Sequence, residues 1–300
     1  MPKMVTWQSI SSNFDRQTSI CRKSFRDMAI APMLPAMEKG VPIRSLSRGI
    51  AVLQAINRGK SLSMMEIART SEVPYPTACR IVQTLLYEAL IEREPSRKRY
   101  RPTALAQTLA HGFQGHAELV QASRAHIVEL TRQVGWPISL ATHVGHSMVI
   151  RDSTHALTAL TFNYYYPGYA LPVLECASGL VYLSHVSAGE RESILRTLKL
   201  LPNTATSHVI TLFEENGFAE QIRAQGYCTR GNNQFTNNPG KTSSIAVPIF
   251  DKGHIVGTLT LAFFSTSTKM DEATRQFLEP LQRAAAAITA DLAGAGTAAT

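Results

Sequence analysis

The strongest structural signal in this chain is the stretch PYPTACRIVQTLLYEALIEREPSRKRYRP, residues 74–102. It opens with two prolines, which a helix tolerates in or before its first turn but not in its interior. Apolar residues then recur at helical spacing, and two short strand-like runs follow around the tip PSRK. The pattern predicts a proline-started helix followed at once by a basic β-hairpin.

Two more helices are predicted immediately upstream. SLSRGIAVLQAINRG has apolar residues at helical spacing and ends at Gly59, and SLSMMEIARTSEV contains a short helix that Ser63 can cap. The tight turn SEVPYP joins this short helix to the proline-started one. Such a pair predicts a helix-turn-helix whose second helix is the recognition helix, and the hairpin after it predicts a wing.

The distribution of charge supports this interpretation. Residues 41–103 carry 11 basic and 5 acidic side chains, a net charge of +6, whereas residues 104–300 carry 13 basic and 14 acidic ones. A basic segment attached to a neutral body is typical of a module that binds a polyanion, although a solvated basic face is the alternative. We therefore expect residues 41–103 to be a winged helix-turn-helix that binds double-stranded DNA.

The expected DNA contacts come from the outward face of the recognition helix and from the wing tip. Because Ala78, Ile81 and Leu85 face the core, the side chains between them point outward, and those near the helix start lie nearest the major groove. Threonine and arginine can read base edges there, and other basic residues bind phosphate. The predicted DNA-binding residues are Tyr75, Pro76, Thr77, Cys79, Arg80, Thr84, Arg97, Lys98 and Arg99.

IRSLSRGIAVLQAI followed by LSMMEIARTSEVPYPTACRIVQTLLYEALIERE resembles the N-terminal domain of IclR-type bacterial transcriptional regulators. LPVLECASGLVYLS and GYCTRGNNQFTNNPGKTSSIAVPIFDKGHIVGTLTLAF are similar to the effector domain of the same family, so the resemblance covers about residues 43–290. One departure is Ala89, where the family often has a glycine. Alanine in a left-handed cap costs roughly 1 kcal/mol, so we expect the recognition helix to end differently here.

Beyond residue 103 helical and strand-like patterns alternate. PISLATHV, SMVIRDS and ALTALTF predict a strand meander, and SSIAVPIFD and HIVGTLTLAFF predict two strands joined by DKGH. Helices are predicted for SGLVYLSHV, AGERESILRTLKLL, HVITLFEENGFAEQIRAQGY and DEATRQFLEPLQRAAAAITADLAG. A sheet flanked by helices suits an α+β sensor domain of GAF-like kind.

The expected fold is therefore α+β, with an N-terminal winged helix-turn-helix at residues 41–103. By the resemblance, a helix or two stacked helices at 104–134 link the domains and pair the subunits, and residues 135–293 bind an effector. Residues 294–300 are a tail. Residues 1–40 fit no family pattern, so we expect them to be a disordered leader or, with the true start at Met37, not to be translated.

The motifs of enzymes do not occur. ECASGLV lacks the GxSxG pattern, and there is no HExxH or P-loop. His143 and His146 lie three residues apart without a third ligand nearby, and the cysteines form no CxxC pair. The sequence therefore predicts no catalytic residues, no metal and no cofactor. A small-molecule enzyme with a nucleic-acid-binding appendage is the rival from another class.

The stretch FNYYYPGY, residues 162–169, holds five of the chain's aromatic residues. It lies within VIRDSTHALTALTFNYYYPGYALPVLECASG, which looks closest to the MhpR-like branch, whose members respond to aromatic acids such as hydroxyphenylpropionates. Such rings can stack on a flat ligand, or pack in the core or at a subunit contact. We expect one set of them to line a pocket.

The resemblance also implies where the effector binds, between the central sheet and the loops over it. Family members that bind small keto acids tend to have an acidic or neutral residue where Arg230 falls. A guanidinium there can clamp a carboxylate, although a surface salt bridge is the alternative. The implied effector-binding residues are Leu160, Phe162, Asn163, Tyr164, Leu171, Ala177, Ser178, Arg230, Ser243, Ser244 and Thr260.

Together these patterns predict a cytoplasmic transcription factor, a homodimer or homotetramer that binds a palindromic operator. Its effector is expected to be a small carboxylic acid, aromatic and phenylpropionate-like, and its target a catabolic operon. A repressor of central metabolism that senses a short keto acid is the alternative. RNA polymerase is a candidate further partner, and no membrane is expected because no apolar run approaches 18 residues.

Overall fold

The computed structural model describes residues 43–59, 61–109, 116–160, 165–199, 207–215, 217–231 and 240–295. These residues divide into two compact units, residues 43–109 and residues 116–295. Three predictions lie outside the described residues: the leader at 1–40, most of the tail, and the effector contacts of Phe162, Asn163 and Tyr164. No helix in the described ranges is long and apolar enough to cross a membrane.

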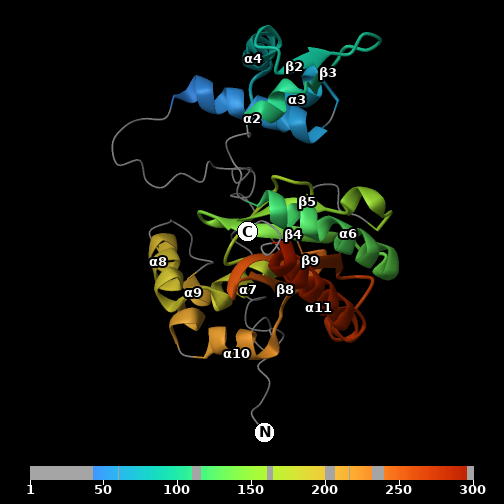
Figure 1. Ribbon diagram of the computed structural model, residues 1–300. Coiled ribbons are helices and arrows are strands. Elements are labelled where there is room, and N and C mark those ends of the chain that lie inside the picture. The colour runs from blue at the N-terminus through green and yellow to red at the C-terminus, as the bar shows by residue number, and fades with distance from the viewer. Residues whose placement is uncertain are drawn as a thin grey trace. The chain divides into compact units, whose positions relative to one another are not determined.

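The first unit is a helix-turn-helix with a wing (Figure 1). Its core is formed by buried residues from all three predicted helices, among them Val52, Ile67 and Val82. The helices are α2 (Arg44–Gly59), α3 (Met64–Thr70) and α4 (Tyr75–Tyr87), followed by the short α5 (Leu105–Thr108). The strands β1 (Leu62–Ser63), β2 (Ile91–Arg93) and β3 (Arg99–Pro102) form a sheet in the order β1-β3-β2. The predicted helices and hairpin are confirmed.

Ser63 begins α3, as predicted. The Glu66 amide donates to Ser63 Oγ (3.4 Å), and the Ser63 amide donates to Glu66 Oε2 (2.8 Å). This reciprocal pair of hydrogen bonds is a capping box, which satisfies two amides at the helix start.

The recognition helix α4 ends in the left-handed cap that the sequence argued against. Ala89 has a φ of 55°, its amide donates to the Leu86 carbonyl (3.1 Å), and the Leu90 amide donates to the Leu85 carbonyl (3.0 Å). These two bonds make a Schellman motif. Thr103 also donates through its hydroxyl to the Ala89 carbonyl (2.6 Å). The expectation of a different helix end is therefore wrong, because contacts from beyond the wing hold alanine in this conformation.

The second unit contains a six-stranded antiparallel sheet in the order β6-β5-β4-β9-β8-β7. The strands are β4 (Ile138–Val144), β5 (Ser147–Ser153), β6 (Ala170–Pro172), β7 (Cys228–Arg230), β8 (Thr242–Asp251) and β9 (His254–Phe264). The predicted strands of PISLATHV, SMVIRDS, SSIAVPIFD and HIVGTLTLAFF are confirmed.

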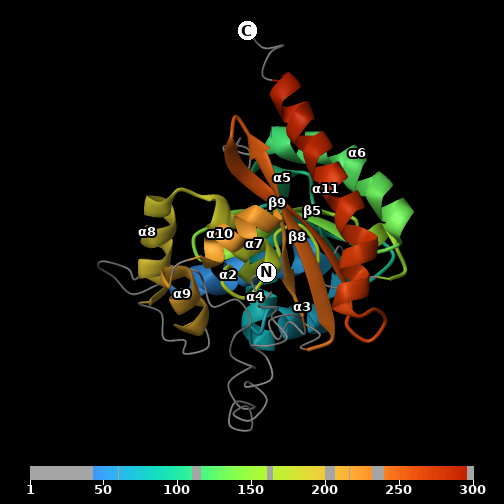
Figure 2. The ribbon, with the colours of Figure 1, turned by 90° about the horizontal axis from the view of Figure 1, so that it is seen from below.

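Helices cover both faces of this sheet (Figure 2). One face packs against α6 (Ala117–Val134) and α11 (Met270–Ala295), which also contact each other. The other face packs against α7 (Ala177–His185), which contacts α10 (Phe218–Gln225). Two further helices, α8 (Ala188–Lys199) and α9 (Ser207–Glu214), contact each other. The helix predicted to link the domains thus contributes α6 to the second unit, and its role between subunits stays a prediction.

Two details differ from the sequence prediction. ALTALTF does not form a strand in its described part, since His155–Leu157 is a 3₁₀ helix, η2, and residues 158–160 have no regular structure. The edge strand beside β5 is β6 instead. HVITLFEENGFAEQIRAQGY forms two helices, α9 and α10, because Gly217 has a φ of 107° at the start of the second.

Candidate DNA-binding surface and effector site

The predicted reading residues lie on the outward face of α4. Ala78, Val82 and Leu85 are buried in the core of the first unit. The side chains between them are exposed or half-buried, namely Tyr75, Pro76, Thr77, Cys79, Arg80 and Thr84. The first two turns of α4 therefore present hydroxyl and guanidinium groups that can reach a DNA groove.

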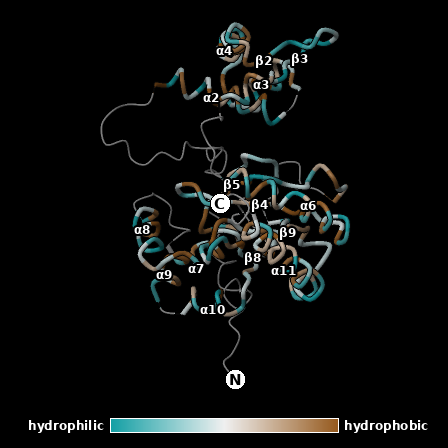
Figure 3. Tube along the Cα trace, viewed as in Figure 1, coloured by the Kyte–Doolittle hydropathy of each residue, from teal (hydrophilic) through white to brown (hydrophobic). Residues whose placement is uncertain are grey.

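The three basic residues predicted at the wing tip differ in their surroundings. Arg97 and Lys98 are exposed in the loop between β2 and β3, which is hydrophilic along its length in Figure 3. Arg99 is instead turned toward the start of α3, where Nη2 lies 2.8 Å from Glu66 Oε2 and Nε donates to Ser61 Oγ (3.2 Å). The prediction that Arg99 contacts DNA from the wing tip is not supported, because its guanidinium ties β3 to the capping box.

Most of the predicted effector residues gather on the α7 side of the sheet. Leu171 and Ala177 belong to the core cluster there, and Ser178 is buried in the first turn of α7. Ser244 pairs with Arg230, and Thr260 pairs with Ala246 of the same cluster. Since side chains alternate along a strand, Ser244 and Thr260 share the face of Ala246.

Two predicted effector residues lie elsewhere. Ser243 pairs with Phe263 and therefore lies on the α11 side of the sheet, where its hydroxyl is 2.9 Å from that of Ser265. Leu160 is 44% exposed and lies beside Gly135, at the end of α6. Side chains alternate between the two faces of a sheet, so Ser243 and its neighbour Ser244 cannot both lie on the α7 side.

Arg230 pairs with a carboxylate that the sequence reasoning missed. Arg230 Nη2 donates to Glu175 Oε2 (2.8 Å), and the two side chains are 12% and 3% exposed. Burial raises the pKa of Glu175 to about 7, and the Arg230 guanidinium opposes that rise. The salt bridge of Arg230 is thus buried rather than on the surface, and whether Arg230 also binds a ligand carboxylate stays a prediction. The available signal was a single acidic residue within the apolar run LPVLECASGLV.

The start of α7 is packed tightly onto the turn before it. A Cβ on Gly179 would lie 1.8 Å from the Val173 carbonyl oxygen, so only glycine fits there. Ser178 Oγ lies 3.2 Å from Cys176 Sγ. Burial raises the pKa of Cys176 to about 11, and this thiol is therefore protonated at neutral pH. This packing places Glu175 at a fixed point beside the sheet.

The described part of the aromatic stretch FNYYYPGY packs on the α7 side of the sheet. Tyr165 is buried in the α7-side cluster, and Tyr169 packs against that cluster. Their rings lie 5.8 Å apart, and Tyr166 lies 5.8 Å from Tyr169. Burial raises the pKa of Tyr165, so its hydroxyl stays protonated. At least one ring of FNYYYPGY is therefore a core residue.

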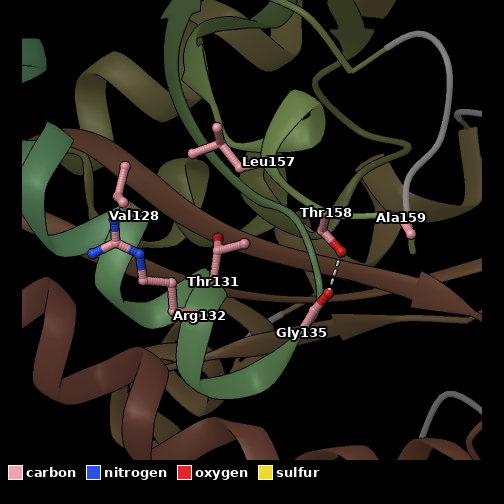
Figure 4. Close-up of a pocket in the computed structure, with 7 residues that line it drawn as sticks. All are labelled: Val128, Thr131, Arg132, Gly135, Leu157, Thr158 and Ala159. Carbon is pink, nitrogen blue, oxygen red and sulfur yellow. Dashed lines mark hydrogen bonds between the residues drawn. The ribbon is translucent and has the colours of Figure 1, made fainter.

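A cavity of about 450 Å³ lies at the end of α6 rather than on the α7 side of the sheet (Figure 4). Two of its hydroxyls are hydrogen-bonded, since Thr158 donates to the Gly135 carbonyl (2.6 Å) and Thr131 Oγ1 lies 2.6 Å from Thr154 Oγ1. Its lining is Val128, Thr131, Arg132, Gly135, Leu157, Thr158 and Ala159. The α7 side stays the candidate effector site, because buried polar groups and most of the predicted residues converge there.

The paired histidines do not assemble a metal centre in the described part of the chain, which contains no group of three potential ligands. His143 stacks instead on Tyr182, with ring centroids 4.7 Å apart. Burial lowers the pKa of His143, which favours the neutral imidazole.

Two family models match this chain. Residues 45–95 match the IclR helix-turn-helix domain, and residues 112–290, more than half of the chain, match the C-terminal domain of bacterial transcriptional regulator IclR. The chain belongs to the IclR family. It is a DNA-binding transcriptional regulator with an effector-binding C-terminal domain, and the predicted α+β fold with an N-terminal helix-turn-helix is confirmed.

Individual relatives agree with this assignment. The HTH-type transcriptional regulator TsaQ1/TsaQ2 of Comamonas testosteroni is 22% identical over 159 residues, which cover 52% of this chain and 57% of that protein. XynR of Escherichia coli K12, also an HTH-type transcriptional regulator, is 23% identical over 82% of this chain and 96% of its own length. The matching families and relatives are regulators, which decides against the rival enzyme interpretation.

The fold is also that of solved IclR-type structures. An IclR homolog from Microbacterium hydrocarbonoxydans, complexed with 4-hydroxybenzoate, superposes with a TM-score of 0.56. It is 22% identical, and the match covers 83% of this chain and 98% of that one. At this identity the likeness shows the fold alone.

Proposed function

We propose that this IclR-family regulator senses an aromatic carboxylic acid of the phenylpropionate kind and thereby controls a catabolic operon. The observation that carries the proposal is the convergence of Arg230, Glu175, Ser244 and Thr260 beside buried Tyr165 on one face of the sheet. Few polar groups set among apolar and aromatic ones are typical of a small-ligand site.

Two likenesses support an aromatic ligand. Residues 149–179 resemble the MhpR-like branch, whose members respond to aromatic acids. The homolog from Microbacterium hydrocarbonoxydans, which has the same fold, was solved with 4-hydroxybenzoate. An IclR-type domain can therefore accommodate a single aromatic ring that carries a carboxylate.

The first unit supplies the DNA-binding half of the proposal. Its outward residues on α4 read base edges, and Arg97 and Lys98 of the wing bind phosphate. Two such modules in a cytoplasmic homodimer or homotetramer match a palindromic operator. The effector shifts the balance between arrangements that bind DNA well and poorly, and RNA polymerase is a partner at the regulated promoter.

A thermal-shift panel on the full-length protein tests the effector class. Phenylpropionate, hydroxyphenylpropionates, benzoates and cinnamates are compared with pyruvate and glyoxylate. A ligand at 100 times its dissociation constant adds about 2.7 kcal/mol, a rise of several degrees in the melting temperature of a domain of this size. Selective stabilisation by aromatic acids is expected. Stabilisation by keto acids alone would move the protein to the metabolic alternative.

A further inference from the structure

The buried polar atoms on the α7 side of the sheet that have no hydrogen-bond partner include Glu175 Oε1 and Thr260 Oγ1. Glu175 is 3% exposed, and its Oε2 accepts from Arg230 while its Oε1 accepts from nothing. Thr260 is 8% exposed, and its Oγ1 also makes no hydrogen bond. Buried polar groups in folded proteins are nearly always satisfied, so an acceptor and a hydroxyl left over on one face indicate a ligand that completes them.

The spacing of these atoms sets the size of such a ligand. Glu175 is held by Arg230 on β7, whereas Thr260 is on β9, with β8 between them. Adjacent strands lie about 4.8 Å apart, so Arg230, which holds Glu175, and Thr260 are on strands about 10 Å apart, with an offset of two residues in register. The side chains on this face between them are short, namely Ser244, Ala246 and Ala262. One aromatic ring with a short acid chain can span that distance above them.

The charges decide which end of the ligand lies where. The Arg230 charge is already compensated by Glu175, and a ligand carboxylate beside them would meet the Glu175 carboxylate at close range. The group that Glu175 Oε1 requires is a hydrogen-bond donor. At the other end, Thr260 offers a hydroxyl that can donate to a carboxylate, whereas Ser139, its neighbour on β4, already donates to Ser153 Oγ (3.3 Å).

We propose that Glu175 selects the effector by accepting a hydrogen bond from a hydroxyl group on its aromatic ring, while Thr260 binds its carboxylate. The ligand class is thus an aromatic acid with a hydroxyl at the end of the ring opposite the acid. Arg230 is a positioning residue that orients Glu175. This inference rests on the proposed function, since it specifies the aromatic acid.

The ionisation of the surrounding groups agrees with this role. Burial raises the pKa of Glu175 to about 7, against the opposing Arg230 guanidinium, so the carboxylate is an ionised acceptor above that pH. Burial raises the pKa of Cys176 to about 11 and of Cys228 to about 12, and it also raises that of Tyr165. Among these neighbours only Glu175 changes charge near neutral pH.

The test is calorimetric titration of the full-length protein at pH 8 with 3-(4-hydroxyphenyl)propionate and with 3-phenylpropionate, which differ only in the hydroxyl. The hydroxylated acid is expected to bind about tenfold to a hundredfold more tightly, the usual effect of a hydrogen bond to a charged group. Glu175→Gln is expected to reduce this ratio to a few-fold. Glu192→Gln, the same change at an exposed residue of α8, leaves the ratio intact.

Each other outcome has a definite meaning. Equal binding of both acids to the native protein would overturn the role of Glu175 and leave the proposed function standing. Binding of neither acid would overturn both. A ratio unchanged in Glu175→Gln would assign the preference to another residue. Should that variant fail to fold, Glu175→Asp, which keeps the charge but withdraws the carboxylate, is expected to reduce the ratio as well.

Discussion

Replacing Ala89 by glycine measures the strain stored at the end of the recognition helix. A non-glycine residue in the left-handed region costs roughly 1–2 kcal/mol, and glycine returns about 0.5–1 kcal/mol of that through its larger unfolded-state entropy. Ala89 has a φ of 55° and an exposed side chain, so no packing is lost. Ala89→Gly should therefore stabilise the first unit by about 0.5–1 kcal/mol.

Amide hydrogen exchange of the full-length protein, followed by mass spectrometry, resolves the first unit from the second. The expected gain slows the exchange of the α4 amides by about two- to fivefold. Glu72→Gly is a positive control, which is expected to slow exchange in the same way. Glu72 also has a φ of 55°, and the Val73 amide donates to the Ala68 carbonyl (3.2 Å) in the same kind of cap. Slower exchange in the control but not in Ala89→Gly would refute the argument that Ala89 is strained.

Three further predictions concern the wing, α7 and the buried pair. Arg97→Ala with Lys98→Ala should lower the slope of log affinity against log salt by about 0.9 for each lost phosphate contact, measured by fluorescence anisotropy with operator DNA; an unchanged slope would remove the wing from the interface. Gly179→Ala should cost about 3 kcal/mol or more in urea unfolding, since its Cβ would lie 1.8 Å from a carbonyl oxygen of the preceding turn, and a native midpoint would contradict that packing. The pKa of Glu175 is raised to about 7 in the folded protein, so the folded state binds the Glu175 proton more tightly than the unfolded state does. The free energy of unfolding therefore falls as the pH rises toward 7, and Glu175 causes no further change above that pH. In Arg230→Met the pKa of Glu175 rises further, so the free energy of unfolding should keep falling above pH 7, by up to about 1.4 kcal/mol per pH unit. A fall that also stops at pH 7, or one that persists when Glu175→Gln is added, would show that Arg230 does not stabilise the ionised form of Glu175.

The features predicted correctly from the sequence are those set by neighbouring residues. Ser63 was predicted to cap α3, and the capping box that it makes with Glu66, three residues later, is a local feature. The apolar spacing of α4 and the strand runs of the wing are equally local. The positions of helices and strands can be predicted from such patterns, because these patterns depend on residues close in the sequence and not on tertiary contacts.

The features that sequence reasoning missed depend on distant partners. Arg230 and Glu175 are 55 residues apart, and only the sheet brings them together. Arg99 has the composition of a wing tip, yet the partner that holds it is Glu66, on another element. At Ala89 the local conformational preference was outweighed by a hydrogen bond from Thr103. In each case a tertiary contact overrides a local preference.

The pairing of Arg230 with Glu175 changes the criterion by which the site selects a ligand. Either charge alone would be costly to bury, so the two residues have to be interpreted together. Above the Glu175 pKa of about 7 the pair is nearly neutral, and attraction of a carboxylate to Arg230 then no longer distinguishes one acid from another. What remains is the direction of hydrogen bonding, because Glu175 Oε1 needs a donor. A short keto acid such as pyruvate offers only acceptor atoms and would leave that oxygen unsatisfied. A hydroxylated aromatic acid supplies the donor, and this difference favours it over the keto-acid alternative.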